Sequence, residues 1–496
     1  MNLDSLKKDN GTVLNIDNDA LYHFARRRDF NIDPSELENE IVKHFNERYL
    51  NAGLSDILYN IDGCTPTKTR EFQGDKYLRR EERGVAVDYS ENKKLRMAYE
   101  IYGKTNVDAF GIWIELCRKN GINPWLSFRM NDVHYANAPT GHSEFGYTAR
   151  EKGWIIGNEA GYRWEHVGSS APWYQYALDY SVPEVRAYFT DYIDELLGKY
   201  DVYGIELDWQ RVIWCFKRDS ADNCIYMNEL MATVNASVAK YEEKYGHKIK
   251  IMARINRDID ENVLFGLDVR NWIKNDWIDV IVVSPYWGNT DSDMPIAKWK
   301  RELEGTGVEV YACLEMHTNH WRYMQNYETV AAQSAMYLSA GADKMYMFNF
   351  MEWEPDYWTT CSSLYHAMSR DKRRYVVTHS NCCPEGMERY VPLPFELGQG
   401  KAGEITLNHG LLDKDGETVL YVGADKADVI PSVTFNGTPL ECVGESDGSY
   451  FGAENKPYPI FAYCVPKQTL TDSAAMTFCA DGETVVRYVE LMNSKS

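Results

Sequence analysis

The segment Lys199-Tyr200-Asp201-Val202-Tyr203-Gly204-Ile205-Glu206-Leu207-Asp208-Trp209-Gln210-Arg211 is the most informative stretch of this chain. A helical run ends at Lys199, and a short apolar strand follows. Alternation along that strand places Glu206 and Asp208 together on one face. Two carboxylates on one buried face repel each other and cost desolvation, so the pair indicates a catalytic or binding site. The structural alternative is an ion pair with an arginine deeper in the fold.

Strands and helical segments alternate on both sides of this stretch, through about residue 375. Seven further strands are predicted at 13–17, 56–62, 125–132, 250–256, 280–287, 308–315 and 344–350. Helical segments are predicted at 34–49, 107–120, 183–198, 224–244, 267–275 and 327–340, with a closing helix near 363–373. Eight strands alternating with helices predict an α/β fold of the (β/α)₈ TIM-barrel type.

The texture of the sequence changes after Pro384. Residues 385–496 lose the helical period and show short alternating runs separated by turn signals, of which Asn436-Gly437 is the sharpest. We therefore predict a barrel domain over 1–384 and a C-terminal antiparallel β-sandwich over 385–496. Two long loops, 63–95 and 133–182, follow the second and third strands and would lie at the mouth of the barrel.

Charge and composition narrow the class of function. The chain of 496 residues carries 53 Lys and Arg against 74 Asp and Glu, a net charge of −21. That charge repels phosphate backbones and anionic membranes, so neither a nucleic acid nor a membrane is an expected partner. No secretory h-region and no membrane-length apolar stretch is visible. The 11 scattered cysteines lack a CxxC pair, so a reduced, cytoplasmic protein is expected.

Cofactor motifs are absent from the sequence. There is no GxGxxG and no P-loop, so no nucleotide cofactor is expected. His317 and His320 could supply two metal ligands, but a third at diagnostic spacing is missing, so no metal is expected either. The sequence leaves the oligomeric state open, and a homo-oligomer is compatible with it.

Polar side chains gather where the predicted strands end, which is the active-site face of such barrels. A mouth lined by these groups suits a small carbohydrate, because each hydroxyl needs a donor and an acceptor. The predicted substrate-binding residues are Asp17, Asn60, Asp62, Arg129, Asn131, His134, Arg254, Asn256, Tyr286, Trp287, His317, Asn349, Glu352 and Trp353. Surface decoration is the alternative for the loop residues.

Two carboxylates across this mouth predict glycoside cleavage, which uses one as acid and the other as nucleophile or base. We expect strands four and seven on opposite sides of the barrel, so that Asp208 or Glu206 faces Glu315. Asp208 lies nearer the mouth than Glu206. Glu206 could instead pair with Arg129 or Arg254. Glu352 is an alternative catalytic carboxylate.

This arrangement resembles the clan A glycoside hydrolases. The resemblance implies an acid/base at the end of strand four, here Asp208 or Glu206, and a nucleophile at the end of strand seven, here Glu315. That clan usually has Asn-Glu ending strand four, where this chain has Glu206-Leu207-Asp208. Locally, 127–134 and 203–211 look more similar to bacterial barrels known as family 10 glycosylhydrolase-like proteins. The likeness covers roughly residues 10–375.

We therefore predict a glycoside hydrolase acting on a small oligosaccharide or glycoside, exo-acting because polymers do not enter cells. One rival is a barrel lyase or isomerase acting on a sugar acid, with Asp208 or His317 as base and Arg129 and Arg254 binding the substrate carboxylate. The other rival is a non-catalytic carbohydrate-binding protein.

Overall fold

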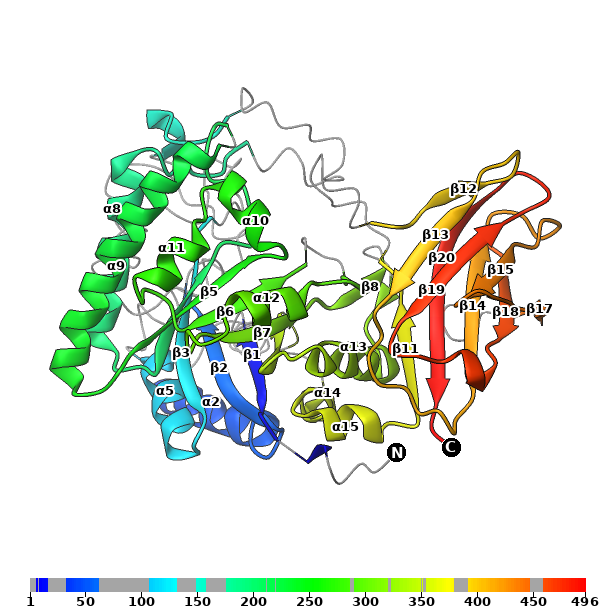
Figure 1. The fold of residues 1–496 in the computed structure, drawn as a ribbon. Helices are drawn as coiled ribbons and strands as arrows, with labels where there is room; N and C mark the ends of the chain where they lie inside the picture. The colour runs from blue at the N-terminus through cyan, green and yellow to red at the C-terminus, as the bar shows by residue number, and fades with distance from the viewer. Residues whose placement is uncertain are drawn as a thin grey trace.

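The computed structural model describes residues 6–7, 9–16, 33–61, 107–131, 149–157, 175–210, 212–218, 220–285, 290–319, 323–348, 350, 354–378, 391–446 and 458–496. Its first part is a closed barrel of eight parallel strands (Figure 1). In chain order these strands are β1 (Thr12–Ile16), β2 (Leu54–Asn60), β3 (Asn123–Arg129), β4 (Gly204–Asp208), β5 (Lys250–Asn256), β6 (Val280–Ser284), β7 (Glu309–Leu314) and β10 (Lys344–Phe348). The barrel closes between β10 and β1, which confirms the predicted fold.

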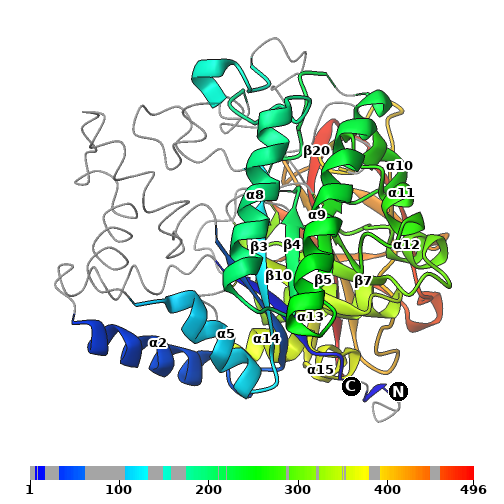
Figure 2. The same ribbon diagram turned by 90° about the vertical axis from the view of Figure 1, so that its left-hand side faces the viewer.

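Helices follow the strands and cover the outside of the barrel. They are α2 (Pro34–Arg48), α5 (Ala109–Lys119), α8 (Pro183–Lys199), α9 (Cys224–Tyr245), α10 (Ile259–Asn262), α11 (Val269–Lys274), α12 (Ile296–Glu302), α13 (Tyr327–Ser339), α14 (Pro355–Cys361) and α15 (Leu364–Ser369). Local signals explain where they begin. The Asp33 side chain caps α2 ahead of Pro34, and Asn326 and Thr329 form a capping box on α13. Helices α8 and α9 lie side by side (Figure 2).

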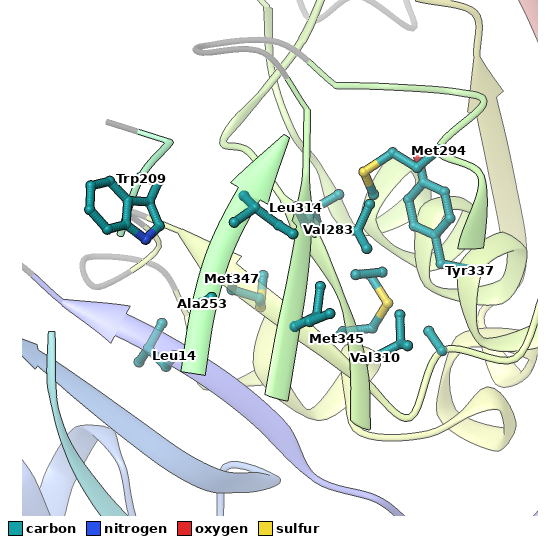
Figure 3. Close-up of a cluster of buried hydrophobic side chains, with 14 of the residues drawn as sticks. Leu14, Trp209, Ala253, Val283, Met294, Val310, Leu314, Tyr337, Met345 and Met347 are labelled. Atoms are coloured by element: carbon teal, nitrogen blue, oxygen red, sulfur yellow. The ribbon is translucent and has the colours of Figure 1, made fainter. Parts of the chain in front are cut away.

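The strands have two different faces. Outward side chains such as Leu14, Val283, Val310 and Met345 join the large core between barrel and helices (Figure 3). The inward face forms a separate apolar cluster in the lower part of the barrel, made of Val13, Leu58, Trp125, Met252, Val280, Val282, Tyr311, Cys313, Tyr346 and Phe348. This alternation is the one that the sequence predicts.

Two antiparallel sheets form the C-terminal part, as predicted. One sheet has the order β11 (Lys372–Val376), β20 (Thr484–Ser494), β14 (Thr418–Ala424), β18 (Ile460–Cys464) and β17 (Cys442–Glu445), with β12 (Phe395–Leu397) also pairing with β20. The other has the order β13 (Gly403–Leu407), β19 (Ala474–Cys479), β15 (Ser432–Phe435) and β16 (Thr438–Pro439). Side chains of both sheets enter one hydrophobic cluster.

Details of these sheets refine the sequence analysis. Asn436 and Gly437 both have positive φ, at 49° and 77°, in the two-residue turn between β15 and β16, as the predicted hairpin requires. Strand β11 lies before residue 385 and partly within the predicted closing helix, yet it pairs with β20. The C-terminal sheet therefore includes residues from 372 onward.

The two parts meet at α13, which lies between the barrel and β11 in Figure 1. Arg374 of β11 forms an ion pair of 3.6 Å with Glu328 of α13. None of the helices in the described ranges combines the length and apolar character that a membrane span requires.

Candidate active site

The inward face of the barrel begins with a close approach between β3 and β4. Gly204 is the inward residue at the start of β4, and a Cβ placed there would lie 2.2 Å from the Trp125 ring. The indole nitrogen of Trp125 donates to Asp56 at 2.9 Å, which fixes the ring across Gly204. The missing side chain of Gly204 therefore makes room for the indole that closes the barrel below the polar residues.

Two residues after Gly204 on β4, the carboxylate of Glu206 lies fully buried among residues of three other strands. Oε2 accepts from Ser127 Oγ at 2.5 Å and from Asn15 Nδ2 at 2.9 Å, and Oε1 accepts from Tyr346 Oη at 2.6 Å. In the described part of the chain these hydrogen bonds, and not an ion pair with either candidate arginine, hold Glu206. Asn15 also contacts Tyr346 and Ser127, so β1, β3, β4 and β10 meet in one hydrogen-bonded layer.

Burial, and after it the nearby charge of Asp208, raise the pKa of Glu206 to about 7. The hydrogen bonds from Ser127 and Tyr346 and the charge of Arg254 act in the opposite direction. Glu206 is therefore a carboxyl group that gains or loses its proton near neutral pH, with Asp208 above it on the same strand.

The next layer contains the two other predicted catalytic carboxylates, and both contact one arginine. Arg254 of β5 reaches Asp208 through one terminal nitrogen, at 3.2 and 3.3 Å, and Glu315 through the other, at 2.7 Å. Its guanidinium carbon lies 3.9 Å from the centre of the Phe348 ring. All three charged side chains are at most 4% exposed. The arginine thus offsets the repulsion between two buried carboxylates.

Strand order corrects one expectation about this pair. Strands β4 and β7 are separated by β5 and β6, so they lie three steps apart around the ring of eight and not directly opposite each other. Asp208 and Arg254 are level in the β4–β5 register, whereas Glu206 is level with Met252. This register explains why Arg254 pairs with Asp208 and not with Glu206.

Asn256 is the inward residue that follows Arg254 on β5. Its side chain is buried, with 1% of the residue exposed, and neither its amide nitrogen nor its amide oxygen has a hydrogen-bond partner in the described structure. An unsatisfied buried amide costs free energy. A ligand hydroxyl beyond Arg254 could supply both the donor and the acceptor that Asn256 lacks.

The remaining described candidates have different surroundings. Arg129 is buried, level with Asp208 in the β3–β4 register, and 5.6 Å from the Phe348 ring centre. Asn60 is buried at the end of β2. His317 lies two residues after Glu315 and begins the strand β8 (His317–Asn319). Desolvation lowers the pKa of His317. These three residues stay predicted binding residues.

Asn131 has a role in shaping the loops above the barrel. Its Nδ2 donates to the carbonyl of Trp214 at 2.9 Å, and its Oδ1 accepts from the Leu178 amide at 2.8 Å. Both ends of this amide thus bind loop backbone. The other predicted site residues, together with loop 63–95 and most of 133–182, lie outside the described residues: Asp17, Asp62, His134, Tyr286, Trp287, Asn349, Glu352 and Trp353.

Ser127, Tyr346 and Gln210 also belong to this site, although they are not among the residues predicted from the sequence. Ser127 and Tyr346 have inward parity, two positions before Arg129 and Phe348, and that parity was the available signal. The side-chain nitrogen Nε2 of Gln210 donates to the Pro285 carbonyl at 3.0 Å. The backbone N–H of Gln210 donates to Asp208 Oδ1 at 2.9 Å. Within the described residues no three His, Cys, Asp or Glu side chains gather as a metal site.

Comparison with known proteins finds likeness only among solved structures. No family model and no curated protein sequence matches the chain. It is similar to the chitinase ChiW of Paenibacillus sp. str. FPU-7, at 9% identity and a TM-score of 0.38, over 97% of this chain and 54% of that one. It is also similar to the glycoside hydrolase domain of PgaB (BpsB) from Bordetella bronchiseptica, at 12% identity and a TM-score of 0.41, over 71% of this chain and 99% of that one.

A third similar structure is the catalytic domain of the GH30 xylanase C from Talaromyces cellulolyticus, at 10% identity and a TM-score of 0.36, over 96% of this chain and 98% of that one. The chain spans just over half the length of the first three structures that it matches. At these scores the likenesses assign neither a family nor an activity. The closed barrel and its site define the class of protein here, a TIM-barrel protein with buried carboxylates at the carboxyl ends of its strands.

Proposed function

We propose that this chain is a glycoside hydrolase in which Asp208 and Glu315 are the catalytic carboxylates. The observation that carries the proposal is the contact of both with the guanidinium of Arg254 at the carboxyl ends of the barrel strands. Because nitrogens on one guanidinium carbon are close together, the nearest oxygens of the two carboxylates lie within about 8 Å of each other. That bound is compatible with a pair of carboxyls flanking one glycosidic bond.

The contact lengths suggest how the two roles divide. Glu315 accepts a charge-assisted hydrogen bond of 2.7 Å, which suits a carboxylate that stays negative and attacks the anomeric carbon. Asp208 has only longer contacts to Arg254, of 3.2 and 3.3 Å. Asp208 would first take up a proton from water and exchange these contacts for the glycosidic oxygen. It would deliver that proton to the leaving group as the bond breaks, and later recover one from the water that displaces Glu315.

The burial of the pair bears on the substrate. Asp208 and Glu315 are 0% and 3% exposed, so the reacting atoms lie in an enclosed place. An enclosed site admits the end of a short saccharide more readily than the middle of a polymer. We therefore propose exo action on a small oligosaccharide or glycoside, with the unsatisfied Asn256 amide binding a sugar hydroxyl.

Arg254 also separates this proposal from the sugar-acid alternative. A lyase or isomerase would use Arg129 and Arg254 to bind the carboxylate of its substrate. The charge of Arg254 is already opposed by two carboxylates, so it offers little attraction to a third. This contact favours a neutral glycoside over a sugar acid.

The test is turnover of neutral aryl glycosides and short oligosaccharides by the full chain, Asp208→Asn, Glu315→Gln and the control Glu309→Gln. Glu309 is at the other end of β7, where it pairs with Lys250 at 2.9 Å. We expect Asp208→Asn and Glu315→Gln to lower kcat about 10²–10⁴-fold and the control to leave it unchanged. An unsaturated product from a sugar acid, with no neutral glycoside cleaved, would establish the lyase. Saturable binding without turnover would establish a binding protein.

A further inference from the structure

The segment Thr290-Asp291-Ser292-Asp293, which follows β6, contacts both the C-terminal sheet and the backbone around Glu315. We infer that the C-terminal sheet domain positions Glu315, through this segment and through Gln325. The role of Glu315 in catalysis rests on the function proposed above, whereas the mechanical connection is independent of it.

The connection begins at Thr378, directly after β11. Its hydroxyl accepts from the Ser292 amide at 2.7 Å and lies 2.9 Å from Ser292 Oγ, which in turn accepts from the Thr378 amide at 3.0 Å. Both residues are buried, with 4% of each exposed. Asn408 adds a bond of 3.0 Å to Asp293 from the loop after β13. Reciprocal buried hydrogen bonds of this kind fix two backbones relative to each other.

The segment is also held from the barrel side. Arg257 is the first residue after β5. It pairs with Asp291 at 2.6 Å and donates to the Asp293 carbonyl. The hydroxyl of Tyr337 on α13 donates to the Asp291 carbonyl, and Figure 3 shows Met294 beside Tyr337. The segment thus has a single arrangement set by β5, α13 and the C-terminal sheet together.

The last step reaches Glu315. Thr290 Oγ1 donates to the His317 carbonyl at 2.5 Å. Gln325 Nε2 donates both to Thr290 Oγ1, at 2.6 Å, and to the Glu315 carbonyl, at 3.2 Å. The backbone N–H of Gln325 donates to the Met316 carbonyl at 2.8 Å. Gln325 is therefore a positioning residue, because it holds the turn after β7 that presents the Glu315 side chain to Arg254.

The interface offers a matched control for this inference. Glu328 of α13 binds Arg374 of β11 at 3.6 Å, so it joins the same two domains. Among the described residues, its ion pair is with Arg374 and not with 290–293 or the turn after β7. Glu328→Gln therefore loosens the docking of the sheet without breaking the path to Glu315, whereas Thr378→Val breaks the first bonds of that path.

The experiment measures hydrogen exchange and kcat in the full chain for Thr378→Val, Thr378→Ser, Ser292→Ala and Glu328→Gln. We expect Thr378→Val and Ser292→Ala to speed amide exchange at least tenfold in 290–293, 315–319 and 323–326. Thr378→Ser, which keeps the hydroxyl, and Glu328→Gln should leave these peptides protected. We further expect kcat to fall about 10–100-fold in the first two variants, with KM less affected, since small misplacements of a reacting group cost that much.

The exchange result decides the inference by itself. Unchanged protection of 315–319 and 323–326 in Thr378→Val and Ser292→Ala, or an equal loss in Glu328→Gln, would overturn it. If exchange follows the expected pattern while the parent cleaves no glycoside, the mechanical connection stands and only the proposed hydrolase function fails.

Discussion

Asp208 and Glu315 come from different strands of the barrel, yet they bind opposite nitrogens of the same guanidinium. Arg254 supplies it from β5, the neighbour of β4, and all three side chains are buried. Arg129 of β3 is also buried and is level with Asp208, so arginines of two neighbouring strands lie beside this carboxylate. Glu206, two residues before Asp208 on β4, adds a third acidic group, and the charge of Asp208 helps to raise its pKa.

Replacement of the shared arginine tests how far the fold depends on it. We expect Arg254→Met to lower the free energy of unfolding by about 3–5 kcal/mol, because two buried carboxylates lose the guanidinium that both of them contact. Chemical denaturation measures the loss. Asp208→Asn and Glu315→Gln, added to Arg254→Met, should restore much of it by removing both charges.

A surface arginine with the same pattern is the control for that substitution. Arg270 binds Asp260 at 2.8 Å and Glu302 at 3.1 Å, but its side chain is 44% exposed. We expect Arg270→Met to change the free energy of unfolding by less than about 1 kcal/mol, because water screens such pairs. Equal losses in Arg254→Met and Arg270→Met would contradict the importance of burial.

The titration of Glu206 predicts a pH dependence of stability. Its pKa of about 7 in the folded chain exceeds the ordinary value of 4.5, so the native state holds a proton that the unfolded chain has released. The associated stability is complete below pH 4.5 and is lost as the pH rises through 7. The contribution is at most about 3 kcal/mol.

Glu206→Gln isolates this contribution, since every other titrating group is common to both proteins. We expect the stability of the parent relative to Glu206→Gln to decline between pH 4.5 and pH 7.5, measured by urea denaturation at four or five pH values. A difference that stays constant over this range would show that Glu206 does not gain its proton near neutral pH.

The sequence predicts the fold, and it predicts which polar side chains point into the barrel. It does not predict which of these side chains contact one another. Alternation alone places Glu206 and Asp208 on the inward face, because a strand has a period of two. Whether Arg254 meets Asp208 or Glu206 depends on the register between β4 and β5, and a shift of two residues would exchange one carboxylate for the other.

Strand β11 also depends on a contact that the sequence does not reveal, in this case with a strand far along the chain. Its sequence, Lys372-Arg373-Arg374-Tyr375-Val376, is compatible with the end of a helix. The buried Arg374 is stabilised by Glu490 of β20, at 2.8 Å. A partner more than a hundred residues away leaves no local signal, so the part of the C-terminal sheet before residue 385 was not predicted.

The close approach at Gly204 predicts a packing defect on substitution. A Cβ at this position would lie 2.2 Å from the Trp125 ring and 2.6 Å from the Lys250 carbonyl, so the indole or β4 must move. We expect Gly204→Ala to lower the free energy of unfolding by about 1–3 kcal/mol. Gly198→Ala in α8 is the control, because its nearest contact is 3.1 Å, to the hydroxyl of one tyrosine. Similar thermal stability of Gly204→Ala and the parent would contradict the clash.

His409 predicts a pH dependence of the opposite sign to that of Glu206. It is fully buried where the C-terminal sheets meet α13, with Tyr375 5.9 Å away, and its Nδ1 lies 3.0 Å from the Gly410 carbonyl. Desolvation lowers its pKa to about 4. Between pH 6.5 and pH 4, His409 is therefore protonated in the unfolded chain but neutral in the folded chain.

Stability should accordingly fall as the pH drops from 6.5 to 4, by about 3 kcal/mol, and stay level above that window. His409→Asn retains a donor for the Gly410 carbonyl but cannot titrate. We expect the parent to lose stability relative to His409→Asn as the pH falls, in urea denaturation over the same range used for Glu206. If the two proteins keep a constant difference down to pH 4, His409 is protonated as easily in the folded chain as in water, and the interface around it is open to solvent.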